Sequence, residues 1–256
     1  MRVVYCVYGK RKYVLQMEGS IASLRQFHPE AKIEIHTTPD WAPRLAHLGA
    51  DIRLIDTLTP RDSAWHDPMM KAAAIRAACG SDLLYLDNDT YICGPLQSAW
   101  DMLEKFDYMG VHAPIYDQRE FLGYPAPDDL PRPPDAFTEW NSGVLFLSGR
   151  QTTTDLIEYW QSLLSRGYEG GSDQWLLRVA LWQGAGRSHV LPPIYNCRLP
   201  LRPSVYGQIR VLHAEHPNLA QVAKALNADL GPRQIRRRDG EWTYALAHKK
   251  QSRPAM

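Results

Sequence analysis

The segment from Leu83 to Thr90 constrains the fold of this chain most, because four apolar residues are followed at once by two aspartates. The run Leu83-Leu84-Tyr85-Leu86 has no polar face, which is typical of a strand buried on both sides in a mainly parallel sheet. The residues before it alternate between β-branched runs and stretches with helical spacing of apolar side chains. We expect strands at 2–8, Lys32–Thr37 and Ile52–Ile55, and helices at Tyr13–Phe27, Trp41–Leu48 and Met69–Ala78. This alternation predicts an α/β fold with a mainly parallel sheet and helices on both of its faces.

The second half of the chain is less regular. A Pro-rich stretch at 114–140 shows little periodicity, and loops of that length in compact domains are usually functional. We expect a strand at Val144–Leu147, helices at Asp155–Leu164 and Ser172–Trp182, and a mostly extended, Pro-rich stretch at 190–210. The sequence predicts one domain over residues 1–230 and a basic C-terminal tail over 231–256.

Composition excludes several classes of function. The net charge of +1 provides no general attraction for nucleic acid, and the four cysteines form no C-x-x-C pair that would indicate a zinc site. The chain has no apolar run of the ~20 residues that span a bilayer, and it begins with a strand rather than a secretory signal. We therefore expect a cytoplasmic protein. The basic tail is either a solvated, disordered terminus or a surface for peripheral contact with the inner face of the membrane or with a lipid-linked acceptor, where Trp242 and Tyr244 would suit the interface.

Asp87 and Asp89 are the strongest chemical signal. Ligands in parallel sheets bind beyond the carboxyl ends of the strands, and two carboxylates at such an end can approach one oxygen-seeking cation. That cation would bridge two phosphates of a nucleotide-sugar and neutralise charge on the departing diphosphate. The alternative is a solvated turn, because Asp87-Asn88-Asp89 is also good turn chemistry.

The same residues also fit the D-x-D-x-T motif of haloacid-dehalogenase-like phosphatases. In those enzymes the motif normally follows the first strand of the domain, whereas here two or three strands precede it. A downstream G-D-x-x-x-D segment is also missing from the sequence. A metal-dependent phosphatase therefore remains the weaker alternative.

The segment Tyr85-Leu-Asp87-Asn-Asp89-Thr90 resembles the D-x-D segment of the retaining glycosyltransferases of family 8, the glycogenin and lipooligosaccharide galactosyltransferase group. Three further segments match in order and approximate spacing: Lys71 upstream, Asn141-Ser142-Gly143-Val144, and Gly171-Ser172-Asp173-Gln174. The resemblance covers residues 1–220. It implies a GT-A (nucleotide-diphospho-sugar transferase) fold and transfer of a hexose from a UDP-sugar, with retention, to a hydroxyl acceptor on a glycan, glycolipid or protein.

The resemblance also implies roles for individual residues. Asp173, Gln174 and Asn141 would be catalytic and would position the sugar and stabilise its cationic transition state. Donor binding would fall to the end of the first strand and the matched segments, that is, to Tyr8, Tyr13, Lys71, Asp87, Asn88, Asp89, Asn141, Ser142 and Gly143. The family's C-terminal histidine corresponds in position to His213, with His216 as the alternative third metal ligand. A histidine ligand favours Mn²⁺ over Mg²⁺.

The chain departs from the family after His213, where the H-x-x-G-x-x-K-P-W continuation is missing. Arg210 and Lys224 are the candidates to replace the lysine that helps to bind the diphosphate there. On the acceptor side we expect the two Pro-rich stretches, with Tyr116, Asp117, Trp140 and Tyr195 as the residues to probe. A non-catalytic nucleotide-sugar-binding protein is the remaining alternative function.

Overall fold

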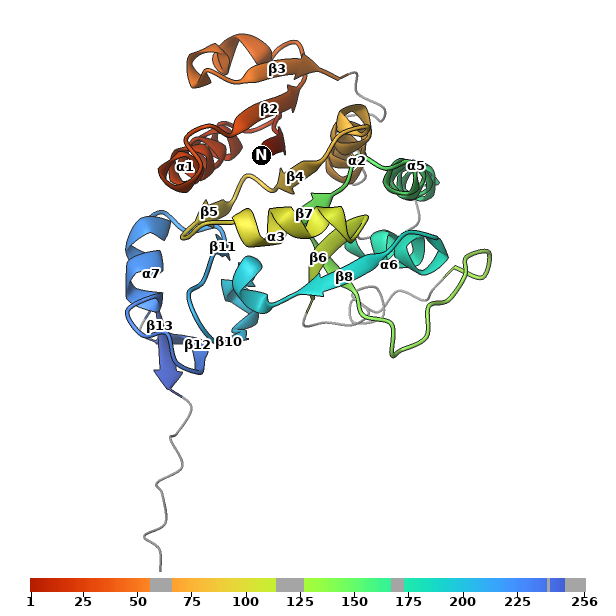
Figure 1. Cartoon of the computed structure of the whole chain (residues 1–256). Coiled ribbons are helices and arrows are strands. Elements are labelled where there is room, and N and C mark those ends of the chain that lie inside the picture. Colours follow the sequence, from red (N-terminus) through yellow and green to blue (C-terminus); the bar gives the residue numbers. More distant parts are fainter. Residues whose placement is uncertain (56–65, 114–126, 167–172, 239, 247–256) are drawn as a thin grey trace, which may run out of the picture.

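A seven-stranded mixed sheet forms the centre of the molecule, with the strand order β3-β2-β1-β4-β7-β6-β8 (Figure 1). The computed structural model describes residues 1–55, 66–113, 127–166, 173–238 and 240–246. The strands are β1 (Arg2–Cys6), β2 (Lys32–Thr37), β3 (Asp51–Leu54), β4 (Leu83–Leu86), β6 (Tyr108–His112), β7 (Trp140–Leu147) and β8 (Ser188–Leu191). Strand β7 runs antiparallel to β4 and β6, and every other pairing in the sheet is parallel.

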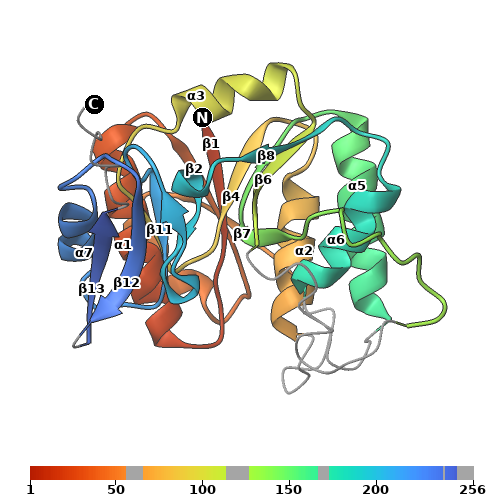
Figure 2. The ribbon, with the colours of Figure 1, turned by 90° about the horizontal axis from the view of Figure 1, so that it is seen from below.

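Helices cover both faces of this sheet, as Figure 2 shows. One face packs against α2 (His66–Ala78), α5 (Gln151–Ser165) and α6 (Asp173–Gln183). The other packs against α1 (Arg11–Phe27), α3 (Gln97–Asp101) and the 3₁₀ turn Met102–Glu104. The mixed, mainly parallel α/β architecture predicted from the sequence is confirmed.

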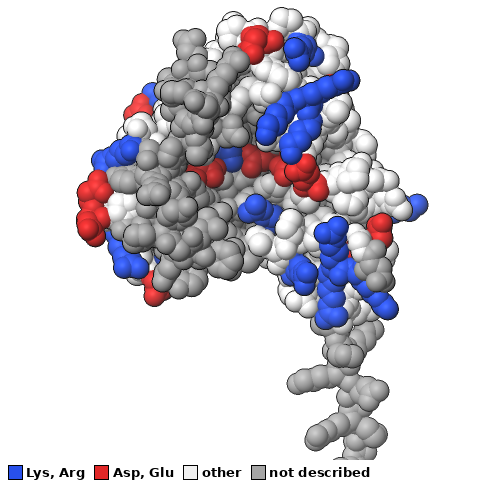
Figure 3. All heavy atoms as spheres, turned by 180° about the vertical axis from the view of Figure 1, so that it is seen from behind, with Lys and Arg blue, Asp and Glu red and all other residues white. Residues whose placement is uncertain are grey.

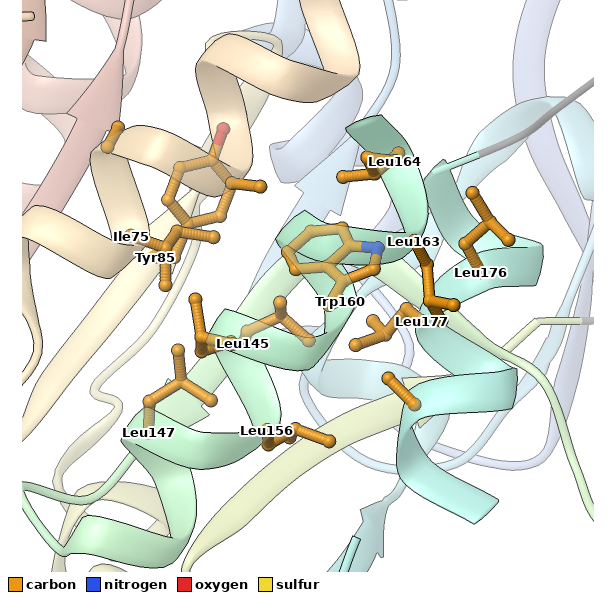
Figure 4. Packing of buried hydrophobic residues seen from close by; sticks show 14 of the residues in the cluster. Ile75, Tyr85, Leu145, Leu147, Leu156, Trp160, Leu163, Leu164, Leu176 and Leu177 are labelled. Carbon is orange, nitrogen blue, oxygen red and sulfur yellow. The ribbon is translucent and has the colours of Figure 1, made fainter. Parts of the chain in front are cut away.

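The hydrophobic core between the central sheet and α5 holds the N-terminus of α6 in place (Figure 4). In α5, Leu156, Trp160 and Leu163 recur at helical spacing and are buried against β7 and α6. Trp160 is fully buried, and its indole N–H donates to the backbone oxygen of Asp173 at 2.9 Å. This hydrogen bond ties the N-terminus of α6 to the core.

Two small sheets complete the described part of the chain. In the first, β11 (Val211–His213) lies between β5 (Thr90–Ile92) and β9 (Cys197–Arg198). The second consists of β10 (Ser204–Val205), β12 (Arg233–Arg238) and β13 (Glu241–Leu246), next to α7 (Leu219–Leu226). Strands β12 and β13 pair antiparallel and Ile235 is fully buried, so a disordered terminus is wrong for these strands of the basic tail. The division at residue 230 stays a prediction.

Some predicted elements differ in the structure. Residues 41–48 form two 3₁₀ turns, Ala42–Arg44 and Ala46–Leu48, instead of the predicted helix. The N–H groups of Arg44, Leu45 and Leu48 each donate to the oxygen three residues earlier, which is the pattern of 3₁₀ turns, and Gly49 ends the segment in a left-handed conformation. The stretch at 190–210 contains the end of β8, two 3₁₀ turns (Pro193–Tyr195 and Leu199–Leu201) and the short strands β9 and β10. Strand β7 begins at Trp140, four residues before the predicted Val144.

The β6–β7 connection leaves and re-enters the sheet at neighbouring points. His112 pairs with Trp140 in the ladder, and the Ala113 N–H donates to the oxygen of Glu139 at 2.7 Å. The position where β7 enters the sheet is therefore set by the ladder itself. Among the described helices, none combines the length and the apolar character that crossing a membrane requires.

Asp107 provides a first test of the structure. Its side chain accepts hydrogen bonds from the Arg187 N–H at 2.7 Å and from Arg150 Nη1 at 2.9 Å, which join the start of β6 to β8 and α5. Burial would raise the pKa of Asp107, but these donors outweigh burial and lower it. We expect Asp107→Asn to lower the free energy of unfolding by about 1.5–3 kcal/mol at pH 7, measured by urea denaturation.

The pH dependence of this effect follows from the lowered pKa. A carboxylate with a depressed pKa in the folded state stabilises above its unfolded pKa and loses that contribution as the pH falls through its folded pKa. The difference between wild type and Asp107→Asn should therefore shrink below about pH 4. Exposed Asp101 is the control, and its replacement by Asn should change stability by less than about 0.5 kcal/mol. A difference that grows in acid would contradict the assignment.

Candidate active site

The matched segments meet at one edge of the sheet because β7 runs antiparallel to β4. The carboxyl end of β4 therefore lies beside the amino end of β7, and Leu86 pairs with Val144. One step further on, the Asp87 N–H donates to the oxygen of Gly143 at 2.8 Å. Segments more than fifty residues apart in the sequence thus meet in one ladder, which this hydrogen bond extends beyond β4.

The segment Asp87–Thr90 is both a turn and an acidic cluster. The N–H of Thr90 and its hydroxyl both donate to the backbone oxygen of Asp87, at 3.2 and 2.8 Å. Asn88 Nδ2 donates to the oxygen of Cys6 at 2.9 Å, which ties the turn to the end of β1. With its backbone satisfied in this way, the turn leaves the carboxylates of Asp87 and Asp89 to face the site.

His213 joins the two aspartates through the small sheet. Its strand β11 pairs with β5, and the Ala214 N–H donates to the oxygen of Asp89 at 3.0 Å. His213 Nε2 lies 3.3 Å from Asp89 Oδ1 and 3.8 Å from Asp87 Oδ2. One ligand atom from each of the three residues lies within 4.8 Å of the others. His216 lies elsewhere, with its Nδ1 accepting the Asn218 N–H.

This set of residues fits a divalent metal ion. Two carboxylates and one imidazole are the donors that Mn²⁺ accepts, and they leave coordination positions for phosphate oxygens. A Cβ atom at position 143 would lie only 2.6 Å from Asp87 Oδ2 and closer still to the His213 ring, so the space between the ligands depends on Gly143. Burial would raise the pKa of Asp89, but its contact with His213 outweighs burial and lowers it to about 2.

Lys71 lies between the acidic turn and the N-terminus of α6. Its Nζ is 3.0 Å from Asp87 Oδ1 and 3.0 Å from Asp173 Oδ2, and Ser142 Oγ also donates to Asp173 at 2.7 Å. Burial lowers the pKa of Lys71, but the two carboxylates outweigh it and raise the pKa above the ordinary lysine value. Burial would raise the pKa of Asp173, but Lys71 and Ser142 outweigh burial and lower it. Lys71 and Asp173 are therefore both ionised at neutral pH.

Three residues that hydrogen-bond to predicted site residues were missed by the sequence analysis. Tyr85 OH donates to Asp87 Oδ1 at 3.0 Å, while Glu139 and Asn196 hydrogen-bond to the predicted residues Gln174 and Asn141. Alternation along β4 places Tyr85 and Asp87 on one face and is the only signal that could have found any of them. The positions of Glu139 and Asn196 depend on pairings between distant segments.

A cavity of about 240 Å³ opens beside these groups. It is lined by Cys6, Tyr8, Tyr13, Gln16, Lys71, Tyr85, Asp87, Asn88, Asp89 and Glu215. Exposed Lys12 lies 3.0 Å from Glu215, which pairs α1 with the segment that follows β11. Acidic side chains gather in a hollow with lysine and arginine side chains on both sides of it (Figure 3).

Other predicted residues are not brought to this cavity. Arg210 lies before β11, at the end away from His213, and Lys224 is exposed on α7. Trp140 is only 3% exposed and packs edge-on against Tyr108 in the core, because β7 begins earlier than expected. Tyr195 is half-buried, with its hydroxyl 2.7 Å from Ser98 Oγ. Tyr116, Asp117 and Ser172 lie outside the described residues.

No protein-family model matches the sequence, and no curated protein matches it. Among solved structures, the chain matches the galactosyltransferase LgtC in complex with donor and acceptor sugar analogues, with a TM-score of 0.57 and 17% identity over 85% of this chain and 88% of LgtC. An active-site variant of LgtC, with glutamine replaced by glutamate, matches with a TM-score of 0.58 at the same identity and coverage. The glycosyltransferase GlyE of Streptococcus pneumoniae TIGR4 has a TM-score of 0.47, too low to establish a shared fold. The likeness to LgtC, with the mixed central sheet, shows that this chain has the GT-A fold.

Proposed function

We propose that this chain is a metal-dependent glycosyltransferase that moves a hexose from a UDP-sugar to a hydroxyl acceptor with retention. The observation that carries the proposal is the meeting of Asp87, Asp89 and His213 beside a cavity that also holds Lys71. The fold shared with LgtC, whose complex contains donor and acceptor sugar analogues, supports a sugar donor and a carbohydrate acceptor. Glycolipid and protein hydroxyls remain the other acceptor classes.

Asp87, Asp89 and His213 would hold the metal ion. When bound, the ion would screen the diphosphate and stabilise it as a leaving group. Lys71 would add positive charge on the same side. In the free protein its ammonium group is paired with Asp87 and Asp173. With Asp89 in the same cavity, the site holds three carboxyl groups to one lysine, a surplus of acidic groups that suits a divalent cation.

Asp173 is the group best placed to meet positive charge on the sugar. Its carboxylate is held by Lys71 and Ser142, so its orientation is fixed in advance. A fixed carboxylate stabilises an oxocarbenium-like transition state more than the neutral sugar, and this difference accelerates the reaction. Asn141 and Gln174 would orient the sugar from the same side. Tyr8 and Tyr13 line the cavity and offer aromatic surface to the nucleobase.

The proposal is tested by thermal denaturation of the wild-type protein with nucleotide-sugars, with and without Mn²⁺. We expect UDP or a UDP-sugar at about 100 times its Kd to raise the Tm by about 5 °C or more, because such binding contributes about 2.7 kcal/mol. The rise should need the metal and disappear in EDTA. Absence of stabilisation by every nucleotide-sugar with both Mn²⁺ and Mg²⁺ would overturn the proposal.

Two activity assays separate the alternatives. A transferase should release UDP slowly from the donor when water replaces the acceptor, whereas a non-catalytic binding protein should bind the donor without releasing UDP. A haloacid-dehalogenase-like phosphatase should hydrolyse p-nitrophenyl phosphate and form an aspartyl-phosphate at Asp87. We expect UDP release and no phosphatase activity.

A further inference from the structure

A buried chain of hydrogen bonds connects His213 to Glu139 through three amide side chains. Gln174 Nε2 donates to Glu139 Oε1 at 2.5 Å, and Asn141 Nδ2 donates to Gln174 Oε1 at 2.8 Å. Asn196 Nδ2 donates to Asn141 Oδ1 at 2.8 Å, and Asn196 Oδ1 lies 2.9 Å from His213 Nδ1. None of the five side chains is more than 6% exposed. Each amide therefore depends on its neighbours to satisfy its polar atoms.

The direction of this chain is fixed at Asn141. An amide has one end that accepts and one that donates, so its orientation follows from its partners. The backbone N–H of Gly143 can only donate, and it lies 3.1 Å from Asn141 Oδ1, so the oxygen of Asn141 must face that side. The hydrogen bond from Gln174 Nε2 to Glu139 Oε1 runs in the same direction. The backbone N–H of Gly143 thus imposes one polarity on the chain.

This polarity determines the protonation pattern of the His213 ring. Because Asn141 presents its oxygen to Asn196, Asn196 must present its amino group there and its oxygen to His213. In the neutral ring Nδ1 must then carry the hydrogen, which leaves the lone pair on Nε2. Nε2 is the atom that faces Asp89 and Asp87.

We propose that Asn196 is a positioning residue that holds His213 in the Nδ1–H tautomer with Nε2 free to bind the metal, and that Glu139, Gln174 and Asn141 set the direction of its amide. The inference rests on the proposed metal site. It also joins the sugar side of the site, at Asn141 and Gln174, to the metal side at His213. Hydrogen bonds to a ligand histidine commonly change metal affinity by about 10- to 100-fold.

The first measurement is the tautomer of His213 in the metal-free wild type, by ¹⁵N-edited NMR at a pH where the ring is neutral. The His213 signals are assigned by their loss in His213→Gln, and His216→Ala identifies those of the neighbouring histidine. We expect the Nδ1–H tautomer. A ring with its hydrogen on Nε2 would overturn the inference whatever the variants show.

The second measurement compares Asn196→Ala with Asn196→Asp by Mn²⁺ titration calorimetry and by NMR. The alanine variant should show mixed tautomers and about 10- to 100-fold weaker Mn²⁺ binding. An aspartate still accepts from His213 Nδ1, so Asn196→Asp should keep the tautomer and bind Mn²⁺ more tightly than the alanine variant. Equal tautomer and affinity in wild type and Asn196→Ala would contradict the inference, as would failure of Asn196→Asp to recover either property.

The two proposals fail in different ways. A wild-type protein that binds neither Mn²⁺ nor Mg²⁺ in the presence of any nucleotide-sugar would refute the proposed function. A wild type that binds Mn²⁺ but whose His213 tautomer does not depend on Asn196 would leave the proposed function intact and refute the positioning role alone. His216→Ala is the matched control and should keep the wild-type Mn²⁺ affinity.

Discussion

Replacement of Asp89 by asparagine is expected to reduce metal-dependent sugar transfer by about 100- to 1000-fold, a loss typical of removing one group that stabilises developing charge. The substitution keeps the shape of the side chain and removes the charge that faces His213 Nε2 at 3.3 Å. Asparagine is also a weaker ligand than a carboxylate for a hard divalent ion. Initial rates of UDP release over a range of Mn²⁺ concentrations would measure the effect.

Asp155→Asn is the matched control for this experiment. Asp155 is exposed on α5 and accepts only a local hydrogen bond from Gln151 among the contacts that the structure describes. Its replacement should leave both the rate and the Mn²⁺ dependence within about twofold of wild type. If Asp89→Asn folds normally and binds Mn²⁺ and UDP with wild-type affinity, Asp89 is not a metal ligand.

Replacement of Lys71 by methionine should have the largest effect on stability. It removes the only cation within 3.0 Å of both Asp87 and Asp173 among the described residues, and its side chain is only 15% exposed. We expect the free energy of unfolding to fall by about 3 kcal/mol at pH 7, the lower end of the range for breaking a buried ion pair, because both carboxylates retain some exposure. Urea denaturation without metal would measure this loss.

Removing one of the two carboxylates that Lys71 contacts should recover part of the stability that Lys71→Met loses. In the double variant Lys71→Met/Asp173→Asn, one of the two uncompensated carboxylates is gone, so the protein should be more stable than Lys71→Met alone. Lowering the pH should also reduce the stability difference between wild type and Lys71→Met. The pKa of Asp173 is lowered mainly by Lys71 against the effect of burial, so its contribution in wild type is lost as the pH falls through that value. A deficit of Lys71→Met that persists unchanged at pH 3 would contradict the ion cluster.

The central strands and the acidic turn were predictable because their signals are local. An apolar run followed by Asp87-x-Asp89 identifies a buried strand and a charged exit without any knowledge of its neighbours. The early start of β7 was harder to see, since Asn141 and Ser142 look like loop residues and are buried only because other polar groups satisfy them.

The remainder of the site depends on pairing between distant segments. Asn141 and Gln174 were predicted from a resemblance, and their contact at 2.8 Å follows from the docking of α6 against β7. Asn196 carries no sequence signal, because its position depends on β9, which pairs with β11 to bring His213 nearby. Because each buried polar group needs a hydrogen-bond partner, burial fixes the positions of these side chains although the sequence around them gives little indication of it.

The two ends of the connection from β6 to β7 lie side by side at the sheet, where the Ala113 N–H donates a hydrogen bond to the oxygen of Glu139. The register between β6 and β7 is consequently independent of how many residues lie in between. Doubling the length of such a closed excursion costs only about 0.6 kcal/mol in chain entropy. Leu130 is buried in the core, and Arg178 of α6 donates to the backbone oxygens of Phe137 and Pro134. Descendants of this protein could therefore change the length of the connection before Leu130 and keep the edge that carries Asp87 and His213. In the proposed transferase, acceptor preference and catalytic chemistry could then diverge separately.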